Sequence, residues 1–457
     1  MVVTIKASYV VTPKEETPKG QFFCLSEVDQ ICRPDHTPSI YIYNNNNVNV
    51  NVLVQRMRDS LSQILVHYYP LCGRLNLIEG GRLKLDCNAK GAMLFEAEST
   101  KTMDEYGDFS PNDDAIKELI PNLDYSQPIE DLPLFLAQVT KFHGGNAVAI
   151  GIAMSHPMCD GISALQFVYS WAKLTRGDSL HPTELPFLDR TVFTASRLPA
   201  SRRFDHPEFK IPPLILGRTD DVEERKKKTK FALLKLTAEQ MQKLKQKANI
   251  DHSCESGQRP YSRFEAIGAY IWRCACKAHG LDKAQPTRAR TMVNIRNKVN
   301  PPLPKNYFGN GLARTVTEIC YAGEITSKLL SYGAQRIREA VEMSGNEEYI
   351  RSQLEFLAQQ ETMDVIRNKY MVKGEHGKPD VSFYGNPNIM LGSWLSMPMY
   401  EVDFGLGKPY YFGPGAVYPL DYGIMAPSRD GDGSIVIFMN FQMADMENFI
   451  NIFWDNL

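Results

Sequence analysis

Two side chains able to exchange protons, His156 and Asp160, stand four residues apart in the stretch SHPMCDG. Pro157 biases the histidine away from the helical conformation, and a glycine follows the aspartate at once. The run before them, NAVAIGIAM, is short and apolar and contains β-branched residues, which predicts a buried strand. His156 should therefore end a strand, Asp160 should lie in a turn, and a helix should begin near Ser163.

This placement limits the chemistry that the stretch can do. A histidine at a strand end is suited to act as a general base, but a core histidine held by a turn aspartate fits the same residues, so both interpretations stay open. His156 and Asp160 do not share one helix face, and no other His/Cys cluster offers a third ligand, so we expect no metal site. The chain has no G-x-S-x-G nucleophile elbow. Cys159 is disfavoured as a nucleophile because adjacent side chains on a tight turn point apart.

A second stretch of interest, YEVDFGLGKPYYFGPG, combines glycines with aromatic residues near the C-terminus. Such glycines favour tight turns and close approach of backbones. Neither GxxxxGK[ST] nor GxGxxG is present, so the stretch is not a phosphate-binding loop of either kind.

The elements that must position these residues indicate two mixed α/β domains, for which 457 residues are sufficient. Residues 186–230, rich in proline and charge and without a sustained period, predict a linker between a domain over 1–185 and a domain over 231–457. The Asn-rich tract Asn44–Val52 is expected to be a loop leading into a helix. Hydrophobic periodicity predicts strands over 1–13, 82–88, 134–142, 147–154 and 433–441, and helices over 53–69, 163–177, 237–248, 260–280 and 446–456.

Composition excludes several classes of partner. A net charge of −2 and a pI near 6.5 give no general attraction for nucleic acid or anionic membranes. No stretch reaches the roughly 18 apolar residues of a membrane span, and the N-terminus lacks the apolar core of a signal peptide. The nine cysteines are scattered, and Cys274 and Cys276 have the wrong spacing for a CxxC pair. We therefore expect a cytoplasmic protein with reduced thiols, and a monomer.

The two stretches, in this order, resemble the plant BAHD acyl-CoA-dependent acyltransferases. That family carries HxxxDG near the middle of the chain, here His156–Gly161, and DFGWG near the C-terminus, here Asp403–Gly407 with Leu406 in place of the tryptophan. The stretches HYYPLCGRL, YFGNG and FYGNPN are also family-like, so the resemblance covers essentially the whole chain. The family loop is mainly architectural, and we expect activity to survive the leucine.

The resemblance implies a fold of two similar α/β domains of the chloramphenicol-acetyltransferase-like type, with the active site in a channel between them. The first domain would carry HxxxD, and the second would carry DFGLG and most contacts to CoA. His156 would act as general base on an acyl-CoA donor, with no acyl-enzyme and no permanently bound cofactor. Asp160 would turn away from the substrate, pair with Arg296 and fix the loop that aims His156. Asp403 completes the implied catalytic set, as a residue that structures its own loop.

CoA carries a diphosphate and a 3′-phosphate, so basic and hydroxyl groups should line one mouth of the channel. The residues implied by resemblance to bind CoA are Ser262, Arg263, Thr291, Asn294, Arg296, Tyr410, Tyr411, Phe412 and Gly413.

Within the family the chain resembles hydroxycinnamoyltransferases, and among these the spermidine N-hydroxycinnamoyltransferases. Relatives acting on shikimate or quinate carry an arginine for the acceptor carboxylate in a segment that reads SWLSMP here, with Ser396 at the arginine position. A serine cannot form that bidentate pair, which favours a polyamine acceptor such as spermidine. The alternatives are O-acylation of an alcohol such as shikimate or quinate, and a degenerate non-catalytic protein. Leu406 permits the latter, and the intact His156 and Asp160 argue against it.

Overall fold

The structure is a computed structural model. It describes residues 2–457 except 21, 45–48, 111–113, 196–203, 219–221, 252–258, 368–371, 374–378, 381–384 and 417–419. Among the helices of the described residues, none combines the length and the apolar character that a membrane span requires.

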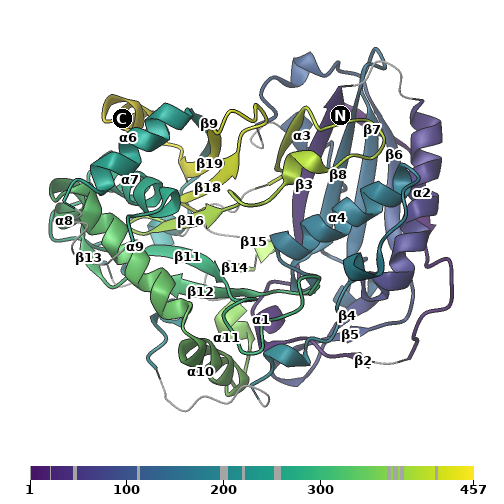
Figure 1. Ribbon diagram of the computed structural model, residues 1–457, viewed down its shortest axis with the longest axis horizontal. Coiled ribbons are helices and arrows are strands. Elements are labelled where there is room, and N and C mark those ends of the chain that lie inside the picture. The colour runs from purple at the N-terminus through teal and green to yellow at the C-terminus, as the bar shows by residue number, and fades with distance from the viewer. Residues whose placement is uncertain are drawn as a thin grey trace.

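The first large sheet is built almost entirely from the N-terminal half and lies on the right of Figure 1. Its strands, in spatial order, are β1 (Val3–Val11), β6 (Ala92–Ser99), β7 (Phe135–Lys141), β8 (Ala147–Ser155), β3 (His36–Asn44) and β17 (Tyr411–Pro414). All neighbours are antiparallel except β6 and β7. Strand β8 is buried along its whole length, because α2 (Val50–His67) and α4 (Gly161–Thr175) pack on one face and α3 (Asp114–Lys117) on the other.

The second large sheet comes from the C-terminal half, on the left of Figure 1. Its strands are β12 (Leu312–Val316), β11 (Ala289–Asn294), β16 (Ile389–Ser393), β18 (Tyr422–Pro427), β19 (Ile435–Gln442) and β9 (Thr229–Leu236). The helices packed against it are α6 (Ala238–Ala248), α7 (Arg263–Ala278), α9 (Leu330–Ser344) and α12 (Met446–Asp455). The expected α/β fold with two sheet-containing halves is confirmed.

Smaller elements fill the space around the two sheets. The remaining strands are β2 (Phe22–Phe23), β4 (Arg74–Leu77), β5 (Leu83–Asp86), β10 (Pro286–Thr287), β13 (Cys320–Tyr321), β14 (Val372–Lys373) and β15 (Pro379–Asp380). The remaining helices are α1 (Glu27–Gln30), α5 (Val222–Arg225), α8 (Ala322–Ser327), α10 (Glu347–Ala358) and α11 (Asp364–Arg367).

The elements predicted from periodicity are present, and capping side chains mark the starts of helices α2, α4, α6 and α7. Helix α2 begins at Val50, inside the tract expected to be a loop, because the Asn49 side chain accepts the N–H of Val52. Residues 45–48 of that tract lie outside the described residues. Helix α4 begins at Gly161, two residues before the predicted start, because Asp160 is its N-cap.

The positions of two segments were not predicted by any local pattern. Strand β17, just after DFGLG, pairs with β3, so Tyr411 lies opposite Ile42 and the C-terminal half completes the first sheet. This pairing covers what is otherwise a free strand edge. Within the described part of the predicted linker 186–230, Arg190 and Phe193 are buried in the protein. We propose that the chain is divided into a first domain over 1–185, a connecting segment over 186–230 and a second domain over 231–457.

Candidate functional site

His156 stands where the first sheet ends. Strand β8 runs to Ser155, and a 3₁₀ turn over His156–Met158 follows, with Pro157 at a position where its missing N–H is not needed. The backbone N–H of His156 donates to the carbonyl of Asp35 at 2.9 Å. Its side chain is partly exposed, while Nδ1 is buried without a hydrogen-bond partner among the described residues. The predicted strand end followed by a turn is confirmed.

Asp160 turns into the protein and is buried. Its two oxygens accept hydrogen bonds from the Nη1 and Nη2 of Arg296, at 2.8 and 2.9 Å, in a bidentate ion pair. The N–H of Gly311 adds a third bond at 2.8 Å, and the N–H of Ser163 adds the helix cap. The ion pair expected from the resemblance is therefore present, and it ties the turn to the segment that follows β11.

Arg296 has little freedom for any other partner. Its Nη2 also donates to the Oγ of Ser163 at 2.9 Å and to the carbonyl of Gly309 at 3.0 Å. A Cβ at Gly311 would lie 2.6 Å from its Nη1, so glycine is required there for the close approach. Of the two implied roles of Arg296, these contacts support the pairing with Asp160 over contact with CoA.

The protonation of His156 is set by opposing effects. Burial lowers the pKa of its imidazole, whereas the electrostatic influence of the neighbouring Cys32 and Asp35 raises that pKa to about 9. A base with a raised pKa holds its proton at neutral pH and must lose it before it can act. Cys32 follows α1 and is buried, and no sequence signal connected it with the histidine.

The ratio kcat/KM reports the ionisation of groups in the free enzyme. It should therefore rise with pH up to about 9 and level off above it. Cys32→Ala removes the neighbour that raises the pKa of His156 but leaves the burial, so the rising limb should move to lower pH. The check is to measure kcat/KM for CoA release as a function of pH in the parent protein and in Cys32→Ala. The acceptor titrates identically in both experiments, so a difference between the two pH profiles comes from the protein. Cys24→Ala, at an exposed cysteine, is the matched control. An unmoved limb in Cys32→Ala would contradict this account of the pKa.

Cys159 is unsuited to be a nucleophile, in agreement with the sequence analysis. Its thiol is buried and faces the sulfur of Met154. Burial raises the pKa of the Cys159 thiol well above its usual value, so it stays protonated. His156 is thus left as the group of this turn that can exchange a proton with a substrate.

The DFGLG loop is organised by its own aspartate. One oxygen of Asp403 accepts the backbone N–H groups of Gly405, Leu406 and Gly407 at 2.7, 2.9 and 2.9 Å. Both glycines have positive φ, of 88° and 82°, which a residue with a side chain rarely adopts. Leu406 is partly buried against the core of the first half. These contacts support a structural role for Asp403.

The residues implied to bind CoA lie at the start of α7, on and just after β11, and around β17. Ser262 caps α7, where its Oγ accepts the N–H of Glu265. Arg263 is exposed and lines a surface hollow of about 310 Å³ together with Lys245 and Gly433. Within the other implied set, Thr291 is buried and Asn294 exposed.

The segment Tyr410–Gly413 contacts the loop between β18 and β19 through Tyr410. The guanidinium of Arg429 lies over the ring of Tyr410, 4.0 Å from its centroid, and donates to its carbonyl at 3.1 Å. Gly433, which lines the hollow with Arg263, belongs to the same loop. Phe412 and Gly413 are buried, and Tyr411 is partly buried. Arg263 and Tyr410, one from each of two predicted CoA-binding segments, therefore border the same loop.

The segment implied to select the acceptor borders the glycine of HxxxDG. A Cβ at Gly161 would lie 3.5 Å from the Cε of Met397 and 3.9 Å from the Nε1 of Trp394. Ser396, between these two residues, is exposed. Glu401, the nearby acid, is exposed and forms an ion pair with Lys408 at 2.6 Å, so it is not free for an amine.

Within the part of the chain that the structure describes, no group of three or more His, Cys, Asp and Glu residues is arranged to hold a metal ion.

Sequence reasoning missed three buried residues around the His156 turn: Asp29, Arg190 and Asn310. A weak signal existed for Asp29, since Ser26 and Asp29 form a capping box with the S-x-x-D spacing. Asn310 lies in YFGNG, which the resemblance singled out without a role. No local pattern marks Arg190, which falls in the predicted linker.

Comparison with known proteins agrees with this architecture. The model of the Transferase family matches residues 1–454. The chain is 39% identical to the hydroxycinnamoyl-CoA:piscidic acid hydroxycinnamoyltransferase of Actaea racemosa and 34% identical to the shikimate O-hydroxycinnamoyltransferase of Nicotiana tabacum. It is 33% identical to the hydroxycinnamoyl-CoA:5-hydroxyanthranilate N-hydroxycinnamoyltransferase of Avena sativa. Each of these alignments covers 100% of both chains.

Two solved structures share the fold at low sequence identity. Vinorine synthase superposes with a TM-score of 0.72 at 19% identity, over 98% of each chain. The complex of F. graminearum TRI101 with coenzyme A and T-2 mycotoxin superposes with a TM-score of 0.75 at 17% identity, over 94% of this chain and 97% of that one.

Proposed function

Because the chain belongs to the transferase family, we propose that it moves a hydroxycinnamoyl group from its CoA thioester to a nucleophilic acceptor, with His156 as general base. The observation that carries the proposal is the position of this imidazole. It is partly exposed on a turn whose other end is fixed by the buried pair of Asp160 and Arg296. The relatives named above, which share the whole length of the chain, support the hydroxycinnamoyl donor.

In the proposed reaction, the acceptor nitrogen or oxygen attacks the thioester carbonyl carbon as neutral His156 takes its proton. A tetrahedral intermediate forms, and its collapse restores the carbonyl and breaks the carbon–sulfur bond. The CoA thiolate leaves and receives the proton from the His156 imidazolium. No acyl-enzyme is required because the thioester is already activated, and the buried thiol of Cys159 agrees with this.

We propose that CoA lies along the loop between β18 and β19. Basic side chains gather there: the exposed Arg263 and the half-buried Lys245 around the hollow, and the exposed Arg429 over Tyr410. Guanidinium and ammonium groups suit a ligand with a diphosphate and a 3′-phosphate. CoA is a substrate in this scheme, and no permanently bound cofactor takes part.

For the acceptor we propose a polyamine such as spermidine, which would be acylated on nitrogen. Ser396 stands where the resemblance places an arginine in relatives that bind a carboxylate, and its exposed hydroxyl offers no such pair. A second candidate is a hydroxy acid acylated on oxygen, which the relatives at 39% and 34% identity favour by the acceptors in their names.

With p-coumaroyl-CoA as donor, spermidine should support much faster CoA release than piscidic acid, shikimate or quinate. Ser396→Arg should slow the polyamine reaction, because the added cation repels a cationic acceptor. Ser396→Ala, which removes the hydroxyl without adding charge, should keep the parent rate. CoA release with each acceptor is the measurement.

The outcomes separate the candidates. Faster release with a hydroxy acid, or an arginine variant that acylates spermidine as well as the parent, contradicts the polyamine acceptor and leaves O-acylation. No release with any amine or alcohol contradicts the acyltransferase itself and leaves the non-catalytic alternative.

A further inference from the structure

The three carbonyl groups of the His156 turn are each held by a side chain from a distant part of the sequence. The Nδ2 of Asn310 donates to the carbonyl of His156 at 3.0 Å. The two terminal nitrogens of Arg190 donate to the carbonyls of Pro157 and Met158, at 3.1 and 2.5 Å. The main chain of the turn is therefore fixed residue by residue, independently of Asp160.

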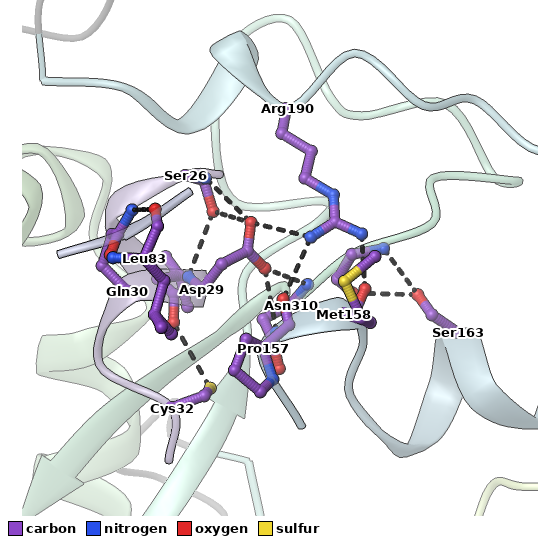
Figure 2. Close-up of polar contacts among 12 residues, drawn as sticks. Ser26, Asp29, Gln30, Cys32, Leu83, Pro157, Met158, Ser163, Arg190 and Asn310 are labelled. Atoms are coloured by element: carbon purple, nitrogen blue, oxygen red, sulfur yellow. Dashed lines mark hydrogen bonds and ion pairs between the residues drawn. The ribbon is translucent and has the colours of Figure 1, made fainter. Parts of the chain in front are cut away.

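Asp29 connects these two donors, as Figure 2 shows. Its Oδ2 forms an ion pair with the Nη1 of Arg190 at 3.1 Å and accepts both the N–H and the Oγ–H of Ser26. Its Oδ1 accepts the backbone N–H and the Nδ2 of Asn310, at 3.0 and 2.9 Å. With so many donors on one carboxylate, the Asn310 amide is held with its nitrogen facing His156.

The cluster lies in the protein interior. The side chains of Asp29 and Arg190 are both 0% exposed, and Asn310 is 2% exposed. The rings of Phe23 and Phe308 flank the Arg190 guanidinium, at 5.3 and 5.8 Å from ring centroid to the guanidinium carbon. In such surroundings water cannot replace a lost partner, so each hydrogen bond has a defined geometry.

The segment Gly309–Gly311 joins this cluster to the other ion pair of the turn. Gly309 accepts a bond from Arg296, Gly311 donates to Asp160, and Asn310 between them bonds Asp29. The ion pair of Asp160 and Arg296 fixes the end of the turn at Asp160. The ion pair of Asp29 and Arg190 holds the part of the turn that carries the imidazole.

We infer that Asp29, Arg190 and Asn310 form a positioning clamp that sets where the His156 imidazole stands relative to the reacting carbonyl. None of the three contacts substrate in this assignment: they act through the carbonyls of the turn. The inference rests on the proposed role of His156 as general base. A displacement of about 1 Å at a reacting group can lower a rate about 10²-fold, which is the effect that the clamp prevents.

Asn310→Ala removes one bond to the turn without leaving a buried charge, and it is the first test. We expect kcat for CoA release to fall about tenfold or more, with KM changed less than about threefold, because the substrate contacts remain. Arg190→Lys keeps a charge beside Asp29 but cannot reproduce the fork that holds two carbonyls. It should lower kcat in the same way.

Gln353→Ala is the matched control. The Nε2 of Gln353, on α10, also donates to a buried carboxylate, that of Glu208, and to a backbone carbonyl, that of Arg314, and neither partner belongs to the His156 turn. Its loss should lower the melting temperature comparably to Asn310→Ala and leave kcat unchanged. If Asn310→Ala and Gln353→Ala lose equal stability but only Asn310→Ala loses kcat, the effect on kcat comes from positioning of His156 and not from a weakened fold.

His156→Ala in the same assay tells the two proposals apart. If His156→Ala keeps the parent rate, the base assignment fails. If His156→Ala is inactive while folded Asn310→Ala keeps the parent kcat, or loses kcat no more than Gln353→Ala, the clamp is overturned and the base assignment stands. Should Arg190→Lys fail to fold, the Asn310→Ala result decides alone.

Discussion

Replacing His156 by alanine should lower the rate of acyl transfer by a factor of about 10²–10⁴, the usual loss when a general base is removed. The fold should survive, because the contacts of this residue with the rest of the turn are made by its main chain. Its N–H bonds Asp35 and its carbonyl accepts from Asn310, and alanine retains both groups. CoA release under saturating substrates measures the rate, and thermal unfolding checks the fold.

The matched control is His67→Ala, at an exposed histidine in the last turn of α2. It should leave the rate unchanged and so exclude a general effect of losing an imidazole. Near-parent turnover in a folded His156→Ala protein would end the general-base mechanism.

The largest expected effect on stability comes from Asp160→Asn. The substitution leaves the Arg296 guanidinium buried without its carboxylate, which typically costs about 3–5 kcal/mol. That is a large part of the total stability of an ordinary domain, about 5–15 kcal/mol. The rate should fall as well, because an amide offers one acceptor oxygen where the carboxylate offers two, so the Gly311 N–H and both arms of the Arg296 guanidinium can no longer all be satisfied and the turn is loosened.

Urea unfolding and CoA release, measured on the same preparations, test this expectation. Asp430→Asn is the control: its pair with Lys235 is at the surface, and breaking it should cost less than about 1 kcal/mol. A double variant with Arg296→Gln should recover part of the stability, because the unpaired buried charge is gone. Full stability together with complete inactivity in Asp160→Asn would instead assign Asp160 a chemical role.

Local rules were sufficient to predict much of the fold. The alternation over 1–13 is strand β1, and the apolar spacing over 53–69 lies within α2 apart from its last two residues. Pro157 and the glycine after Asp160 correctly predicted a strand end and a turn at His156, because both act on the conformation of their immediate neighbours. The order of HxxxDG and DFGLG indicated the family, and the pairing of Asp160 with Arg296 followed from that resemblance alone.

Other features depend on residues that are distant in sequence, and these could not be predicted. Asp29 and Asn310 are separated by 281 positions, and each in isolation is an ordinary polar residue. Cys32 affects the pKa of His156 only because the fold places the two residues close together. Strand β17 has the composition of a strand, but nothing local indicates that it pairs with β3 in the other half.

The amino-acid sequence by itself determined the backbone that carries His156, a strand end followed by a turn, since proline, glycine and hydrophobic period act over a few neighbouring residues. The tertiary structure decided what surrounds that residue. The packed chain buries Asp29 and Arg190, which then form an ion pair that fixes the turn. The same packing leaves Ser396 exposed at the surface. The reason is physical: the strength of a charge or hydrogen bond depends on whether water can reach it, and only the packed chain determines that.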